Sequence, residues 1–141
     1  MTAAMYGRRS TSNRYLADSL ETASPTTLLV MLYDRLVLDL QRAEQAQRDG
    51  EREVAHDNLV HAQDIVCELQ VNLNDELWDG AGDLQALYTW LVKELVVANV
   101  SGDAERTAAC RTAVVEPLAE AWRQAALEHL GAVSGTGHGV A

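Results

Sequence analysis

Apolar residues recur at steps of three and four along four long stretches of this chain, a spacing typical of amphipathic α-helices. The first stretch begins at Pro25 and ends near Arg48, and the other three cover about 51–73, 83–100 and 104–130. The connections between them are short, and short connections force successive helices to run antiparallel. Nine Gly and two Pro in 141 residues are too few for a turn-rich all-β fold. The pattern therefore predicts an all-α protein, an antiparallel up-down four-helix bundle.

Helix boundaries are marked by capping residues. Ser24 can accept a hydrogen bond from a free backbone N–H as an N-cap, and Pro25 suits the first helical position because its N–H is not needed there. Gly50 ends the first long helix, and Ser101-Gly102-Asp103 separates the last two. Pro117 lies inside the last helix, so we expect a kink there.

The two ends of the chain have a different composition. Residues 1–12 are small and polar, and 131–141 contain four Gly, so both are predicted to be disordered tails. Between them, 13–130 form the helical domain. Its first part, 13–21, carries Tyr15 and Leu20 and predicts a short accessory helix that must dock on the bundle, because it is too short to be stable alone.

The first long helix has more apolar surface than one core-facing stripe needs. Leu29, Leu32, Leu36 and Leu40 follow one face. Apolar residues also occur well outside that stripe: Leu28, Val30, Met31, Tyr33, Val37 and Leu38. A surface helix would be more polar on its far side. We therefore expect this helix to be contacted on more than one face, with one face available to a partner.

Charge and cysteine content narrow the function classes. The net charge is −10 and Lys93 is the only lysine, so nucleic acid and anionic membranes are disfavoured partners. No apolar run approaches the ~18 residues of a membrane span, and Arg8-Arg9 precedes no apolar signal region. Cys67 and Cys110 lie in separate predicted helices, which indicates small buried thiols in a reducing, cytoplasmic protein.

Candidate chemistry is sparse. Glu53-Val-Ala-His56 matches half of a bundle di-iron site, but no second Glu-x-x-His exists, so we expect no metal and no cofactor. An alternative is a phosphotransfer bundle acting through His56 or His61, although their neighbours are Asp57 and Asp64 and no Lys is near. A structural domain that self-associates is a third hypothesis. A bundle with surplus apolar surface and no catalytic set favours a non-enzymatic, helix-in-groove binding module.

Several blocks of the sequence resemble the family of FliS, the flagellar secretion chaperone. The most specific block is Thr22-Ala-Ser-Pro25 followed by Leu28-Leu-Val-Met-Leu-Tyr-Asp34. Weaker matches follow in the right order over about residues 13 to 125: Tyr15, Ala62-Gln-Asp-Ile-Val66, Glu68-Leu69, Gly80-Ala-Gly82, Leu84-Gln-Ala-Leu87-Tyr88, Leu118 and Ala121-Trp122. One departure is Arg35, which stands where the family commonly has a Gly.

The resemblance implies a cytoplasmic export chaperone that binds the disordered C-terminal segment of flagellin in a 1:1 complex. It would prevent early polymerisation and bring its client to the export gate of the flagellar type III apparatus. The candidate flagellin-binding residues are Tyr15, Leu29, Leu32, Tyr33, Leu84, Leu87, Tyr88 and Asn99. Leu29, Leu32 and Leu36 fit core packing better than groove binding, and Asn99 could serve only to cap the last turn of its own helix.

Overall fold

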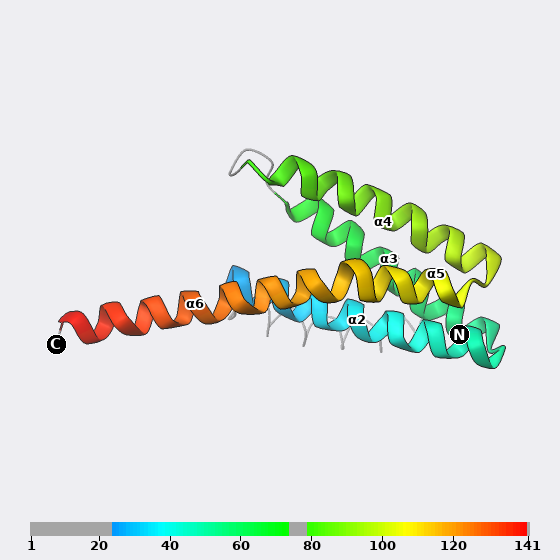
Figure 1. Cartoon of the computed structure of the whole chain (residues 1–141), viewed down its shortest axis with the longest axis horizontal. Coiled ribbons are helices and arrows are strands. Elements are labelled where there is room, and N and C mark those ends of the chain that lie inside the picture. Colours follow the sequence, from blue (N-terminus) through cyan, green and yellow to red (C-terminus); the bar gives the residue numbers. More distant parts are fainter. Residues whose placement is uncertain (1–23, 74–78, 141) are drawn as a thin grey trace, which may run out of the picture.

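The computed structural model describes residues 24–73 and 79–140, and nearly all of them are helical. The elements in chain order are α2 (Pro25–Asp49), α3 (Arg52–Asn72), α4 (Ala81–Ser101), α5 (Ala104–Ala109), the π-helix η1 (Cys110–Val115) and α6 (Glu116–Val140). The last three follow one another without interruption and form the fourth long helix (Figure 1). The expected accessory helix at 13–21, with Tyr15, lies outside the described residues.

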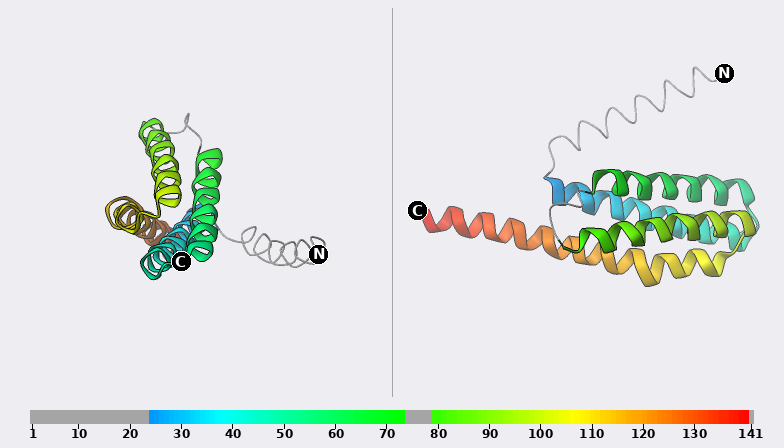
Figure 2. Two further views of the ribbon diagram at one scale, coloured as in Figure 1. Left: turned by 90° about the vertical axis from the view of Figure 1, so that its right-hand side faces the viewer. Right: turned by 90° about the horizontal axis from the view of Figure 1, so that it is seen from above.

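Successive long helices run in opposite directions, which confirms the antiparallel up-down four-helix bundle (Figures 1 and 2). α3 packs between α2 and α4, while the fourth helix packs against α2 through α5, η1 and α6 and against α4 through α5 and η1, and the end of α6 projects beyond the bundle (Figure 1). Within the described residues α4 does not pack extensively against α6. The bundle is therefore closed at the α4–α5 turn and more open at the other end, where α4 and α6 diverge (Figure 1).

The helix ends use the residues that the capping pattern indicated. The Thr27 backbone N–H donates to Ser24 Oγ over 3.1 Å. Gly50 and Gly102 end α2 and α4 with φ of 76° and 65°, in the left-handed region that favours glycine. Asp103 then caps α5 by accepting from the Arg106 N–H at 3.0 Å. These caps fix where each chain reversal occurs and so which helix ends meet.

One buried carboxylate ties α2 to α3. Asp39 is fully buried, and its two oxygens take separate partners: Arg35 Nε donates to Oδ1 at 3.1 Å, and His61 Nδ1 is hydrogen-bonded to Oδ2. A buried carboxylate is costly unless it is paired in this way. Arg35, the departure from the family pattern, therefore has a structural role in this chain.

The fourth helix meets Pro117 differently from our prediction. Instead of a sharp kink at the proline, a π-helical turn precedes it, in which the Glu116 N–H bonds to the Arg111 carbonyl, and the helix bends gently in this region (Figure 2). Cys110 and Val115 are both buried although they are five residues apart. An α-helix would place them on different faces, and the wider π turn brings them to the same one.

One further expectation needs correction. Cys67 is exposed on α3, whereas Cys110 is buried as predicted. α6 continues to Val140, and the disordered tail from 131 stays a prediction. None of the described glycines after 130 adopts a positive φ, so no left-handed cap ends the helix there.

Candidate functional site

An apolar cleft of about 440 Å³ lies at the open end of the bundle. It forms there because α2 begins, α3 ends and α4 begins at this end, so apolar residues from three helix termini meet. Its lining residues are Pro25, Leu28, Leu29, Leu32, Glu68, Leu69, Asn72, Leu73, Leu84, Tyr88 and Trp122. Leu29, Leu32 and Leu73 are only partly buried against the core, so they retain surface that another chain could cover.

A second cleft of about 360 Å³ adjoins the first, between α4 and α6. It is lined by Gly80, Asp83, Leu84, Leu87, Leu118, Ala121, Trp122 and Ala125. Leu84 and Trp122 belong to both clefts, which therefore form one continuous surface that we call the apolar groove. The groove opens between α4 and α6 because α4 is held to the fourth helix mainly near the closed end of the bundle. There Arg106 Nη1 donates to both carboxylate oxygens of Glu94, at 2.8 and 2.9 Å, and α4 and α6 separate toward the open end.

The groove has a small polar floor. The hydroxyls of Tyr33 on α2 and Tyr88 on α4 lie 2.6 Å apart in a hydrogen bond, and the two side chains are 1% and 2% exposed. Burial raises the pKa of both tyrosines above the ordinary value of 10.0, so both stay protonated at neutral pH. The Trp122 ring lies 6.5 Å from that of Tyr33. Its indole N–H is buried, and its interaction with the Tyr33 hydroxyl opposes the effect of burial on the pKa of that tyrosine.

The charged residues of the groove are both acidic. Glu68 lines the first cleft and Asp83 the second, and neither forms an ion pair with a described residue. An apolar trough with free carboxylates at its edge suits an amphipathic segment that carries basic residues beside its apolar ones.

Most of the residues predicted as a site come together here. Leu29, Leu32, Leu84 and Tyr88 line the first cleft, and Leu87 lines the second. Tyr33 contributes only from beneath, since it is buried and bonded to Tyr88. Our sequence reasoning did not select several other lining residues: Leu28, Leu69, Leu73, Leu118 and Trp122. The surplus apolar residues of α2 pointed to Leu28, but nothing in the sequence showed where α4 and α6 would separate.

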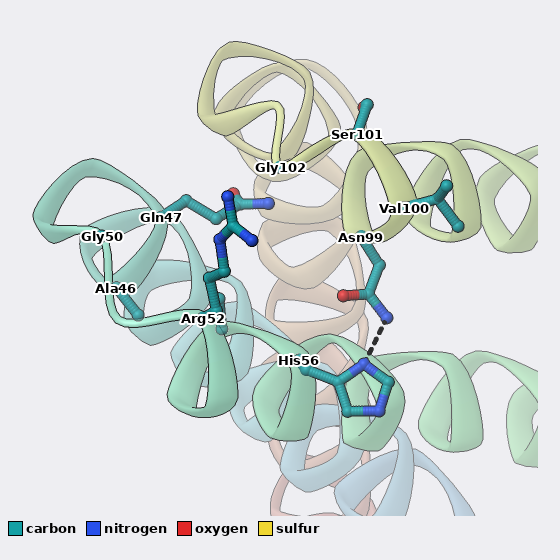
Figure 3. Close-up of a pocket in the computed structure, with 10 residues that line it drawn as sticks. Ala46, Gln47, Gly50, Arg52, His56, Asn99, Val100, Ser101 and Gly102 are labelled. Atoms are coloured by element: carbon teal, nitrogen blue, oxygen red, sulfur yellow. Dashed lines mark hydrogen bonds between the residues drawn. The ribbon is translucent and has the colours of Figure 1, made fainter.

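Asn99 lies apart from the others, at the closed end of the bundle. It belongs to a separate pocket of about 540 Å³ between the α2–α3 and α4–α5 turns (Figure 3). There Asn99 Nδ2 is 3.0 Å from His56 Nδ1, and Gln47 Nε2 donates to the Ala98 carbonyl at 3.0 Å. The structure therefore gives Asn99 a contact between α4 and α3 and does not bring it to the apolar groove.

The two histidines considered for phosphotransfer have structural partners. His61 is bonded to the buried Asp39, and His56 to Asn99 (Figure 3). Within 24–73 and 79–140, no group of three or more His, Cys, Asp or Glu is placed to hold a metal ion. No helix in the same ranges is long and apolar enough to cross a membrane. What the described surface offers most clearly is binding of an apolar segment.

Comparisons with known proteins agree on one family. A family model described as flagellar protein FliS matches residues 8–129. Two curated relatives are flagellar secretion chaperones FliS, one from Bacillus subtilis (strain 168), 32% identical over 111 residues (79% of this chain, 82% of the relative). The other is from Escherichia coli (strain K12), 30% identical over 108 residues (75% and 79%). A solved bacterial flagellar chaperone, 19% identical, aligns with a TM-score of 0.68 over 86% of this chain and 98% of that one, which supports the fold.

Proposed function

The chain belongs to the FliS family of flagellar secretion chaperones, and from this premise we propose that its apolar groove binds the C-terminal segment of flagellin. The role is binding without catalysis. In the cytoplasm a 1:1 complex would keep that segment from polymerising and would carry it to the flagellar export apparatus, including its gate.

The observation that carries this proposal is the continuous groove that the four helices leave at the open end of the bundle. Leu29, Leu32 and Leu84 present apolar surface there that the chaperone's own core does not fully cover. A disordered segment that folds as an amphipathic helix could bury its apolar side in the groove, which offsets the entropy lost on ordering. Glu68 and Asp83 would then favour basic residues at the edge of that helix.

Leu28→Glu tests the proposal with little risk to folding, because Leu28 lines the groove but is outside the buried core and its partly buried neighbours. A charge there must be desolvated when an apolar segment docks. We expect the Kd for a peptide of the flagellin C-terminal segment, measured by calorimetry, to rise at least ~10-fold, as for the loss of an interface hot spot. Far-ultraviolet circular dichroism should remain unchanged.

The matched control is Val54→Glu, which places the same charge on the exposed face of α3, at a residue that is 44% exposed and does not line the groove. This variant should bind the flagellin peptide like wild type. If Leu28→Glu binds as tightly as Val54→Glu while both stay folded, the groove is not the client site.

A further inference from the structure

The side of α4 that faces away from the bundle is apolar along its length. It carries exposed residues at steps of three, four and seven: Ala86, Trp90, Lys93, Val97 and Val100, which we call the outer face of α4. Trp90 is 44% exposed, Val97 42% and Val100 85%. The core residues of the helix, such as Leu91 and Leu95, lie on the opposite side. Figures 1 and 2 show α4 at the edge of the bundle, with no other helix of the described residues beyond it.

This face also differs from the rest of the surface in charge. Lys93 is exposed and forms no ion pair with a described residue. The only other charged residues of α4 are Asp83, which lines the apolar groove, and Glu94, which is paired with Arg106. The outer face of α4 therefore has one positive charge at its centre, and its nearest unpaired carboxylate, Asp83, lies at its edge seven residues before Trp90, in a protein whose net charge is −10.

The outward side of α3 lacks this arrangement. The outward side of α3 also exposes valines, including Val60 and Val71, but they alternate with exposed carboxylates such as Asp57, Asp64 and Glu68. Carboxylates in such a surface oppose close approach of an acidic partner and keep the valines solvated. From Trp90 to Val100 the outer face of α4 has no unpaired carboxylate, and a half-exposed Trp is among the residue types most enriched at binding hot spots.

We propose that the outer face of α4 is a second protein-docking surface, which binds an amphipathic helix of another protein with apolar side chains on either side of a central carboxylate. The carboxylate would pair with Lys93, while the apolar side chains would cover Trp90 on one side and Val97 on the other. Charge complementarity selects this occupant. A membrane surface does not fit, because one lysine supplies little attraction and the net charge repels anionic lipid.

This surface goes beyond client binding, because it lies on the opposite side of α4 from Leu84 and Tyr88, which line the apolar groove. A helix docked there would leave Leu84 and Tyr88 accessible to the client. The chaperone could therefore hold its client and a second protein at the same time. The two sites can also be tested separately, since no residue of the outer face lines the groove.

The test uses the full chain and three labelled, alanine-based helical peptides, each with two leucines on one face, separated by a central Glu, Gln or Lys. By fluorescence anisotropy, wild type should bind the Glu peptide ~2–5-fold tighter than the Lys peptide, the range of an exposed ion pair. Lys93→Glu should reverse that order. Trp90→Ala should weaken binding of the Glu peptide more than ~10-fold, whereas the control Val71→Ala, at an 81% exposed residue of α3, should not.

Further measurements separate this proposal from its competitors. Leu28→Glu, which should weaken client binding in the groove, should leave binding of the Glu peptide unchanged. If Leu28→Glu abolishes it, the peptide occupies the groove and the proposal fails. Equal affinity for all three peptides, or no reversal in Lys93→Glu, would also overturn it. So would sedimentation showing a wild-type dimer that Trp90→Ala converts to monomers, since a second copy would then cover this face.

Discussion

Removing one hydroxyl of the Tyr33–Tyr88 pair should cost more stability than removing both. The two oxygens are 2.6 Å apart and both side chains are almost completely buried. Tyr88→Phe leaves the Tyr33 hydroxyl buried without this partner, which costs about 1–3 kcal/mol, whereas replacing both tyrosines by Phe removes both polar groups and is nearly neutral. The double variant should therefore be more stable than either single variant.

The coupling free energy between the two hydroxyls can be measured in a double-mutant cycle, by urea unfolding of wild type, both single variants and the double variant. Each kcal/mol should correspond to a shift in Tm on the order of 4 °C. The coupling should be at least about 1 kcal/mol, with the double variant closest to wild type. If the two single losses simply add in the double variant, the hydroxyls do not depend on each other and the reasoning is refuted.

The same pair predicts a response to alkaline pH. Burial raises the pKa of both tyrosines in the folded state above 10.0. The stability that this provides is complete below about pH 10, the unfolded pKa, and is lost as pH rises above it, because the unfolded chain ionises first. The free energy of unfolding should thus fall above pH 10 in wild type. The fall should be smaller in the double Phe variant, and an equal fall in both proteins would contradict this account.

Three other predictions follow from the helix ends, the thiols and the π turn. Deleting residues 1–20 should leave client affinity equal or tighter, because Pro25 lines the groove and we expect a segment tethered to it to compete with the client there; lost binding with helicity retained would make this segment part of the site. Burial raises the pKa of Cys110 to about 11, so a thiol reagent at pH 8 should label exposed Cys67 much faster, and equal rates would be inconsistent with the fold. Deleting Ala113, which is exposed in η1, should be tolerated, because Cys110 and Val115 are then four residues apart and still share a face in an ordinary α-helix. Deleting the exposed Glu120 from α6 should lower Tm more than deleting Ala113 does. The opposite order of Tm values would argue against the packing role of the π turn.

The sequence determined the number, extent and caps of the helices because these depend on neighbours within a few residues. Ser24, Gly50 and Asp103 act at the ends where their types predicted, and the helix bounds agree within about two residues except at the end of α6, which continues to Val140 rather than ending near 130. The surplus apolar residues of α2 likewise indicated a partner surface before any contact was known. Local periodicity also placed Leu29, Leu32 and Leu84 among the candidates.

Tertiary packing decided what local pattern could not. The five-residue step between Cys110 and Val115 appears in the sequence as a break in register, and only the core on one side of the helix shows that a π turn restores it. Packing also decided the position of Asn99. Its place in the sequence of α4 was compatible with a peptide site, but the residue lies at the opposite end of the bundle from the groove. A residue's distance from another helix is not encoded in its own periodicity.

The groove itself is the clearest case. The sequence shows the apolar stripe of each helix, but it does not show which part of each stripe another helix covers. That α4 leans on α5 at one end and separates from α6 at the other depends on how four sets of side chains fit together, including the Arg106–Glu94 pair and the Tyr33–Tyr88 contact. Packing is a property of all the helices at once, so the sequence determined which surfaces are apolar, and the tertiary structure decided which of them stay uncovered.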